Sequence, residues 1–260
     1  MIHPTAIIDP GAELGRDVVV GPYAVVGPKV TIGDGCTLGA HALVESHVRM
    51  GKGNRLYPFA AVGGPPQDLK FRGEETWVEM GDNNIVREFA TVNRGTAEGG
   101  GITRLGDGNM VMAYCHIAHD CHIGNRMIMA NAATFAGHVT VEDGAIIGGL
   151  SAVHQFVRIG TLCILGGMSG VSKDVPPYVT AAPGRQRKGD GLFGLNKIGL
   201  KRNRFPEETI SALKRAYMMI FRSKDNLKDA LARAEAELPP LPEVKHLVDF
   251  VRSSTRGVMR

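Results

Sequence analysis

An apolar residue recurs at every sixth position over most of this 260-residue chain. The first run has no miss and comprises Ile2, Ile8, Leu14, Val20, Val26, Ile32, Leu38, Val44, Met50, Leu56 and Val62. The spacing is interrupted after Val62 and resumes in phase at Met80, Val86 and Val92. After a second interruption it restarts one residue out of step and continues from Leu105 to Val171. A period of six fits neither an α-helix nor a simple alternating strand. It predicts a mainly β solenoid, the hexapeptide-repeat β-helix.

Three hexapeptides would close one triangular coil, with aliphatic side chains inside and small residues at the corners. The 34 glycines and the single tryptophan suit such a thin, aliphatic core. We expect the solenoid to span residues 1–182, with loops inserted at about 64–76 and 93–104. The second insertion coincides with the one-residue slip in the repeat.

A connector is expected at 183–204 and a small α-helical domain at 205–260. Pro206, followed by Glu207 and Glu208, is typical of a helix start. Apolar residues then recur at helical spacing, with further amphipathic stretches from about Leu227 and from Glu243. The simplest role of these helices is to cover the open end of the solenoid.

The composition limits the possible partners and location. The formal charge of +4 comes without a basic arm or recognition helix, so we expect no nucleic-acid partner. The amino terminus lacks the segments of a signal peptide, and no stretch is apolar enough to cross a bilayer. The four cysteines are not spaced like a disulfide framework or a zinc knuckle. We therefore expect a cytoplasmic protein with no stable membrane insertion.

Histidines are concentrated in one part of the repeat, at His116, His119, His122, His138 and His154. Residues one coil apart lie above one another, about 5 Å apart, so positions can be compared modulo 18. Counted from Leu105, His119, Gly137 and Gln155 share one offset, and His138 and His154 are within one position of it. The sequence therefore predicts that three histidines converge at one corner of successive coils.

Two chemistries fit this histidine cluster. Stacked histidines can bind zinc, as in γ-class carbonic anhydrases, which share this type of solenoid. Alternatively, one histidine acts as a general base and the others hold substrate. A purely structural or sugar-binding solenoid is a third option.

A second file of residues runs beside the histidines, formed by Ala113, Asn131, Gly149 and Gly167. Small side chains in such a file leave a groove for a long, thin ligand, although they can equally be corner residues. A groove beside the histidines suits an acyl chain better than carbon dioxide. No serine or cysteine lies in an obvious nucleophile setting, which favours direct transfer over a covalent intermediate.

Several motifs resemble those of the acyl-carrier-protein–UDP-N-acetylglucosamine O-acyltransferase family. They occur in order along the whole chain: Gln67-Asp-Leu-Lys70, Arg94-Gly-Thr96, His116-Ile-Ala-His-Asp-Cys121, Ala136-Gly-His138, Gly148-Gly149, Ala152-Val-His-Gln-Phe156, Gly166-Gly167, Asp174-Val-Pro-Pro-Tyr178 and Ser254-Thr-Arg-Gly257. The resemblance implies a left-handed β-helix, a homotrimer and active sites between subunits. It also implies transfer of a 3-hydroxyacyl group from acyl carrier protein to the 3-hydroxyl of UDP-N-acetylglucosamine, the first step of lipid A biosynthesis.

The same resemblance implies roles for individual residues. His119 would be the general base, Asp120 would orient it, and the Gly137 amide would stabilise the oxyanion. Substrate would be held by Asp68, Lys70, His116, Asn131, His138, His154, Gln155, Asn196 and Arg202. Gly149 and Gly167 would line the acyl groove, and the glycine at 167 favours a long chain of about fourteen carbons. No metal or separate cofactor is expected, because the donor carries its own phosphopantetheine.

Two positions depart from the family pattern and concern acceptor recognition. Asn93 stands where the family often has histidine, and Ile198 stands where it has an acidic residue. Some relatives acylate a 3-amino sugar and form an amide. N-acylation of such an analogue therefore stays open.

Overall fold

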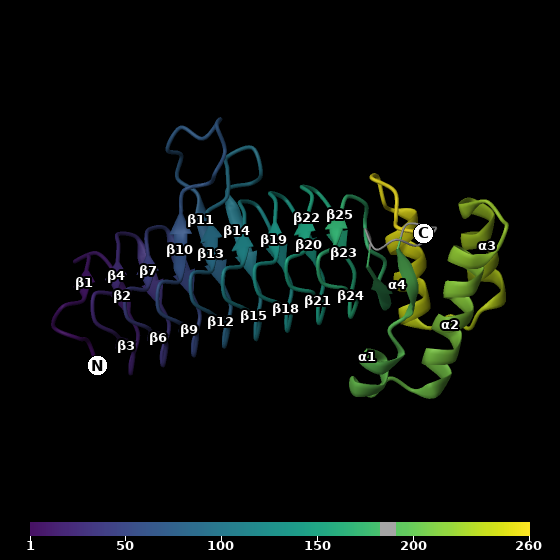
Figure 1. Cartoon of the computed structure of the whole chain (residues 1–260), viewed down its shortest axis with the longest axis horizontal. Helices are drawn as coiled ribbons and strands as arrows, with labels where there is room; N and C mark the ends of the chain where they lie inside the picture. Colours follow the sequence, from purple (N-terminus) through teal and green to yellow (C-terminus); the bar gives the residue numbers. More distant parts are fainter. Residues whose placement is uncertain (183–190) are drawn as a thin grey trace.

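The computed structural model describes residues 1–182 and 191–260, and it consists of a long solenoid with helices at its carboxyl-terminal end (Figure 1). Three sheets of short strands form the solenoid, and all their described pairs are parallel except β26 with β27. Sheet 1 contains β1 (Ile7–Ile8), β4 (Val25–Val26), β7 (Leu43–Val44), β10 (Ala61–Gly64), β13 (Thr91–Asn93), β16 (His116–Ile117), β19 (Thr134–Phe135), β22 (Ala152–Val153) and β25 (Gly170–Val171).

Sheet 2 contains β2 (Glu13–Leu14), β5 (Val30–Ile32), β8 (Val48–Met50), β11 (Trp77–Met80), β14 (Ile102–Leu105), β17 (His122–Ile123), β20 (Thr140–Val141) and β23 (Arg158–Ile159). Sheet 3 contains β3 (Val19–Val20), β6 (Thr37–Leu38), β9 (Arg55–Leu56), β12 (Ile85–Val86), β15 (Met110–Val111), β18 (Ile128–Met129), β21 (Ile146–Ile147), β24 (Ile164–Leu165), β26 (Val179–Ala181) and β27 (Leu192–Leu195). Neighbours within a sheet are mostly three elements apart in the chain, so each coil contributes one strand to each sheet.

The strand register has the predicted period. Ile7 pairs with Val25, and Ile117 pairs with Phe135, and in both pairs the partner lies three hexapeptides further along the chain. In the typical two-residue strand the second side chain points inward, as in β3, where Val20 is buried and Val19 is exposed. The predicted left-handed parallel β-helix is confirmed.

Each coil turns at three corners, which we name by the sheets they join. At the 1–2 corner, Asp120, His138 and Phe156 have φ angles of 59°, 62° and 65°. This left-handed conformation costs a non-glycine residue of order 1 kcal/mol, which the surrounding coils must offset. It recurs at the same place in successive coils and therefore keeps the corner side chains in vertical files.

Two insertions interrupt the coils at the 1–2 corner. Val62 pairs with Val92, which lies five hexapeptides further along instead of the usual three, so the first insertion adds two whole hexapeptides. Val92 pairs with Ile117, which lies four hexapeptides and one residue further along. The second insertion thus adds one hexapeptide and one residue, which accounts for the single slip in the sequence pattern. Both loops project from the same edge of the solenoid (Figure 1).

The helices are α1 (Lys197–Arg202), α2 (Glu207–Arg222), α3 (Leu227–Glu237) and α4 (Pro242–Arg252). Helices α2 to α4 pack on one another and bury one apolar face each, including Leu213, Ala234 and Leu247. The range 183–204, expected to be a connector, contains β27 and α1, and its residues 183–190 lie outside the described part. No helix within residues 1–182 and 191–260 has the length and apolar character needed to span a membrane.

Candidate active site

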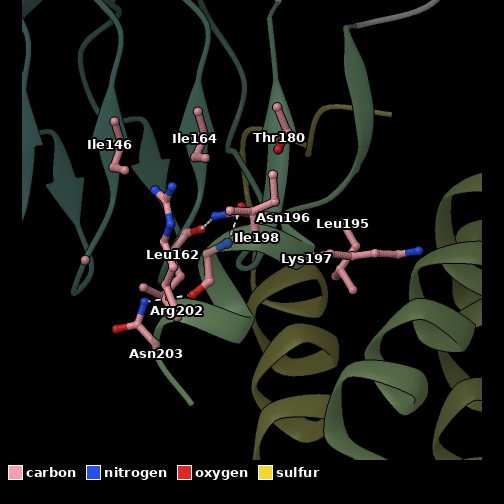
Figure 2. Close-up of a pocket in the computed structure, with 12 residues that line it drawn as sticks. Ile146, Leu162, Ile164, Thr180, Leu195, Asn196, Lys197, Ile198, Arg202 and Asn203 are labelled. Atoms are coloured by element: carbon pink, nitrogen blue, oxygen red, sulfur yellow. Dashed lines mark hydrogen bonds between the residues drawn. The ribbon is translucent and has the colours of Figure 1, made fainter. Parts of the chain in front are cut away.

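A pocket of about 560 Å³ lies between α1 and sheet 3, and two predicted substrate-binding residues line it (Figure 2). The Asn196 side-chain oxygen accepts a hydrogen bond from the Gly199 amide (2.9 Å), and its nitrogen donates to the Leu162 carbonyl (2.8 Å). Asn196 is therefore the N-cap of α1 and fixes that helix to the 2–3 corner. Arg202 extends from α1 toward the strands of sheet 3 and supplies positive charge to the pocket. Ile198 also lines it.

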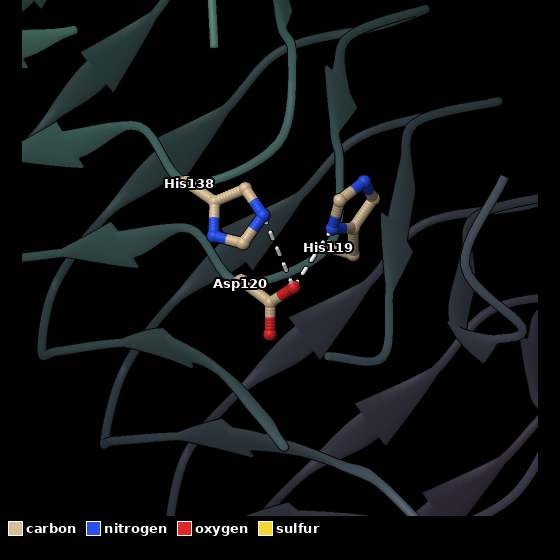
Figure 3. Close-up of side chains that lie close together, drawn as sticks. All are labelled: His119, Asp120 and His138. Atoms are coloured by element: carbon tan, nitrogen blue, oxygen red, sulfur yellow. Dashed lines mark hydrogen bonds and ion pairs between the residues drawn. The ribbon is translucent and has the colours of Figure 1, made fainter. Parts of the chain in front are cut away.

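Most of the other predicted residues gather around the 1–2 corner, where β16 leads into β17. Figure 3 shows His119 and Asp120 side by side there, with Nδ1 of the imidazole 2.8 Å from Oδ2 of the carboxylate. The His119 side chain is 14% exposed and that of Asp120 is 1% exposed. An ionised carboxylate only accepts hydrogen bonds, so Nδ1 carries the proton and Nε2 keeps a free lone pair.

The second insertion closes over Asp120. The Thr96 hydroxyl donates to Oδ2 (2.6 Å), the Thr96 amide donates to Oδ1 (2.9 Å), and the Asp120 amide donates to the Thr103 hydroxyl (2.8 Å). Burial is the largest influence on the pKa of Asp120 and raises it, but the hydrogen bonds from His119 and Thr96 together outweigh burial and lower the pKa. Asp120 is therefore an anion at neutral pH, held in one orientation toward His119.

His138 comes from the next coil and completes a three-residue cluster with His119 and Asp120 (Figure 3). Its Nε2 lies 3.7 Å from Asp120 Oδ2, its ring is perpendicular to that of His119, and it stacks on Phe156 with centroids 4.4 Å apart. Burial lowers the pKa of His138, although the charge of Asp120 opposes this. One donor atom from each of the three residues lies within 4.8 Å of the others, so the cluster has the size of a metal site. Both Asp120 oxygens, however, already accept hydrogen bonds.

Gly137 lies directly against the His119 ring, as the repeat counting predicted. A Cβ atom at Gly137 would approach His119 Cε1 to 2.5 Å and Nε2 to 2.7 Å. Any side chain here would displace the imidazole. Gly137 is buried, and its amide N–H donates to no acceptor among the described residues. Because buried amides are nearly always paired, this N–H is available to a bound ligand.

The remaining histidines contact different partners. His116 faces outward from sheet 1 and its Nδ1 lies 2.7 Å from the Thr91 hydroxyl. Burial, and next the charge of His119, lower the pKa of His116. His154 and Gln155 are exposed one coil above His138. The predicted convergence of three histidines is therefore seen for His119 and His138, whereas the His154 ring contacts the chain's carboxyl-terminal tail through Arg256.

The first insertion brings Asp68 and Lys70 to this corner. The Lys70 ammonium pairs with Glu98 of the second insertion (3.0 Å), and its amide donates to Asp68 Oδ1 (2.9 Å). Asp68, Lys70 and Thr96 line one small pocket between the two loops. The charge of Asp68 also acts on His138 and raises its pKa, against the larger effect of burial. The predicted loop residues thus lie beside the cluster.

Asn131, Gly149 and Gly167 stack at the 3–1 corner, across sheet 1 from His119. A Cβ atom at Gly149 would lie 3.0 Å from the Asn131 carbonyl oxygen, and one at Gly167 would lie 3.2 Å from that of Gly149. Glycine therefore also relieves crowding between coils at this corner. Between the two corners, sheet 1 exposes the small side chains of Thr134 and Ala152.

Three residues of the site had no predicted role: Thr96 and Thr103, which fix Asp120, and Arg256, which contacts His154. Thr96 and Arg256 belong to the motifs Arg94-Gly-Thr96 and Ser254-Thr-Arg-Gly257 that carry the family resemblance. Counting along the repeat could not pair Thr96 with Asp120, because the second insertion interrupts the repeat between these two residues.

Known proteins share this fold and sequence. The family model for bacterial transferase hexapeptide (six repeats) matches residues 11–46, and the model for UDP-N-acetylglucosamine O-acyltransferase, domain 2, matches residues 174–259. Acyl-[acyl-carrier-protein]–UDP-N-acetylglucosamine O-acyltransferase of Thermodesulfovibrio yellowstonii is 50% identical over 259 residues, which cover 100% of this chain and 99% of the relative.

Two solved structures agree with this relationship. LpxA, a UDP-N-acetylglucosamine acyltransferase from Bacteroides fragilis, has a TM-score of 0.96 at 42% identity and covers 100% of both chains. LpxA from Acinetobacter baumannii has a TM-score of 0.95 at 42% identity, covering 100% of this chain and 99% of the other. The resemblance seen in the motifs is confirmed, and the protein is an acyltransferase that belongs to the acyl-[acyl-carrier-protein]–UDP-N-acetylglucosamine O-acyltransferase family.

Proposed function

We propose that this enzyme transfers a 3-hydroxyacyl group from acyl carrier protein to the 3-hydroxyl of UDP-N-acetylglucosamine, the first step of lipid A biosynthesis. The observation that carries the proposal is the His119–Asp120 pair beside the Gly137 amide, which has no acceptor within residues 1–182 and 191–260. The names of the relatives support the same donor and acceptor. A cytoplasmic location is part of this proposal.

His119 is the general base of the proposed reaction. Its Nε2 removes the proton of the sugar 3-hydroxyl as that oxygen attacks the thioester carbonyl carbon. The negative charge of Asp120, 2.8 Å from Nδ1, stabilises the imidazolium that forms. When the carbon–sulfur bond breaks, the imidazolium returns its proton to the leaving thiolate. The products are the sugar ester and the free phosphopantetheine thiol, and His119 is neutral again.

The Gly137 amide is the proposed oxyanion donor. The attack places negative charge on the former carbonyl oxygen, and a preorganised N–H in a partly buried site stabilises that charge. The absence of a side chain at Gly137 also lets the imidazole lie close to this amide. Base and oxyanion donor are therefore held on adjacent coils by the strand spacing of the solenoid.

The exposed face of sheet 1 is the proposed acyl groove. It runs from the His119–Asp120 pair toward Gly149 and Gly167, and small side chains leave it open. A long chain can bury its methylene groups along this face once a second surface covers it, at about 0.8 kcal/mol per buried methylene. We propose that no metal or separate cofactor takes part, since a base, an oxyanion donor and a thioester suffice for the chemistry.

The second surface is proposed to be a neighbouring subunit of a homotrimer. Asn196 and Arg202 line a pocket against sheet 3, whereas His119 lies at the 1–2 corner, on the opposite side of the triangular coil. One substrate can contact both groups only if two subunits contribute to one site. Arg202 from one subunit would then bind the nucleotide diphosphate, and His119 from its neighbour would reach the sugar.

Mass spectrometry of the products tests the function. The purified enzyme is incubated with UDP-N-acetylglucosamine or its 3-amino analogue and a series of 3-hydroxyacyl carrier proteins. We expect an ester with a long acyl chain. An amide formed in strong preference would support the alternative acceptor that Asn93 and Ile198 left open. Nucleotide-sugar binding without any acyl product would contradict the proposal and favour a sugar-binding solenoid.

A further inference from the structure

The carboxyl-terminal tail is anchored beside the proposed active site. Asp174, which is buried, receives a hydrogen bond from the Ser254 hydroxyl (2.8 Å) and forms a β-bridge to Val258. Its amide donates to the Gly257 carbonyl (3.0 Å), and its carbonyl accepts from Met259 (2.9 Å). Val258 and Met259 are buried. The tail therefore holds a defined position against the last coils of the solenoid.

Arg256 uses this position to reach His154. Its Nε and one terminal nitrogen donate to the Ser172 carbonyl, both at 3.3 Å, which fixes the guanidinium. The same terminal nitrogen lies 3.2 Å from Nδ1 of His154. The backbone carbonyl oxygen of Gln155 lies 3.1 Å from that same Nδ1.

These two neighbours make opposite demands on Nδ1 of His154. A guanidinium carries only donors and keeps its protons at all relevant pH values, so beside it Nδ1 must accept. A carbonyl oxygen only accepts, so beside it Nδ1 must carry a proton. A neutral imidazole has one N–H, and its position decides whether Nε2, the other ring nitrogen, is a donor or an acceptor.

We propose that Arg256 is a positioning residue that holds His154 in the tautomer with the proton on Nε2. His154 then presents an N–H donor to an acceptor oxygen of the bound substrates. Without Arg256, the Gln155 carbonyl draws the proton to Nδ1, and Nε2 becomes an acceptor facing an oxygen that is also an acceptor. This inference rests on the proposed function for the identity of the substrates, but the tautomer itself is a property of the free enzyme.

The tautomer is measured by nitrogen NMR of histidine-labelled enzyme without substrate, with His154 assigned by its loss in the H154A variant. We expect the wild type to show an unprotonated Nδ1 and a protonated Nε2, and Arg256→Met to exchange the two. Arg256→Lys keeps a charged donor and should keep most of the wild-type pattern. Arg252→Met is the matched control, because Arg252 pairs with Glu235 on α3 and should leave the spectrum unchanged.

Steady-state kinetics then test whether the effect of Arg256 on the reaction is transmitted through His154. Loss of one hydrogen bond to substrate should reduce kcat/KM about tenfold in Arg256→Met. The double variant with His154→Ala should be no slower than His154→Ala alone, because Arg256 acts through that ring. Losses that multiply in the double variant, or a wild-type Nδ1 that is protonated, would overturn the inference. If the wild type makes no acyl product, the proposed function fails instead, and the spectra still decide the tautomer.

Discussion

Replacing Gly137 with alanine tests the geometry of the base with a single methyl group. The added Cβ would lie 2.5 Å from Cε1 of His119, whereas an ordinary contact is at least 3.4 Å. The ring must therefore retreat by about 0.9 Å, the difference between these two distances. A misplacement of about 1 Å can reduce a reaction rate about 100-fold, so we expect kcat to fall by roughly that factor. The Gly137 amide remains, so this loss reports the base.

The assay follows release of the carrier-protein thiol at saturating donor and acceptor. The φ angle of Gly137 is not in the left-handed region, so alanine adds no backbone strain of that kind. The thermal unfolding midpoint should accordingly stay close to that of the wild type. A lower kcat with a nearly unchanged fold would locate the effect at the imidazole.

Gly11→Ala is the matched control, because its Cβ would meet only the side-chain oxygen of Asp9, at 3.2 Å, in the first coil. This variant should have wild-type kcat. If Gly137→Ala turns over within twofold of the wild type while folded, the His119 ring does not need its observed position, and its assignment as the base is wrong.

Further outcomes follow from the same site. His119→Ala should lose about 10² to 10⁴ in turnover, and stoichiometric zinc in the purified wild type, measured by elemental analysis, would instead favour a hydratase. Gly167→Met should shift product chain lengths downward in mass spectra, while Gly167→Ala should not; equal profiles for all three enzymes would count against the groove. Because the folded-state pKa of Asp120 is lowered, Asp120 contributes stability above its unfolded pKa, and this is lost as pH falls through the folded pKa. Asp120→Asn should therefore flatten the acid side of the stability profile measured by chemical denaturation. The lowered pKa of His138 acts likewise near its ordinary value of 6.5: acidification through this region should destabilise the fold, and His138→Gln should remove that contribution.

The regular part of the fold was predictable because the strand spacing leaves little freedom. An inward aliphatic residue at every sixth position determines which residues pair, so Ile117 above Val92 and below Phe135 follows once the insertions are located. The pattern also showed that the first insertion adds a whole number of hexapeptides, because the spacing resumes in phase, and that the second adds one residue more than a whole number. The strand β27 and the helix α1, which lie inside the expected connector, were not predicted, because they do not follow the hexapeptide period.

In the site too, residues on the regular coils were predictable, whereas residues in the loops and the tail were not. Counting modulo 18 placed His119 against Gly137, since both lie on uninterrupted coils. It could not find Thr96, which reaches Asp120 from inside a loop, or Arg256, whose position depends on how the helical domain docks. Counting along the repeat gave the coil and corner of His154. It could not give the contact of its ring with Arg256, because the carboxyl-terminal tail lies outside the repeat.

The two insertions also bear on how such an enzyme can change. Sliding a strand by one residue would turn its buried side chains outward, so the core tolerates no small change in length. At the 1–2 corner, loops of different length leave the coils and rejoin them without disturbing the pairing of β11 with β14. The corner at which both insertions leave the coils thus lies beside the Asp120 carboxylate. New acceptor preferences can arise there through loop changes while the solenoid that holds the reacting groups stays as it is.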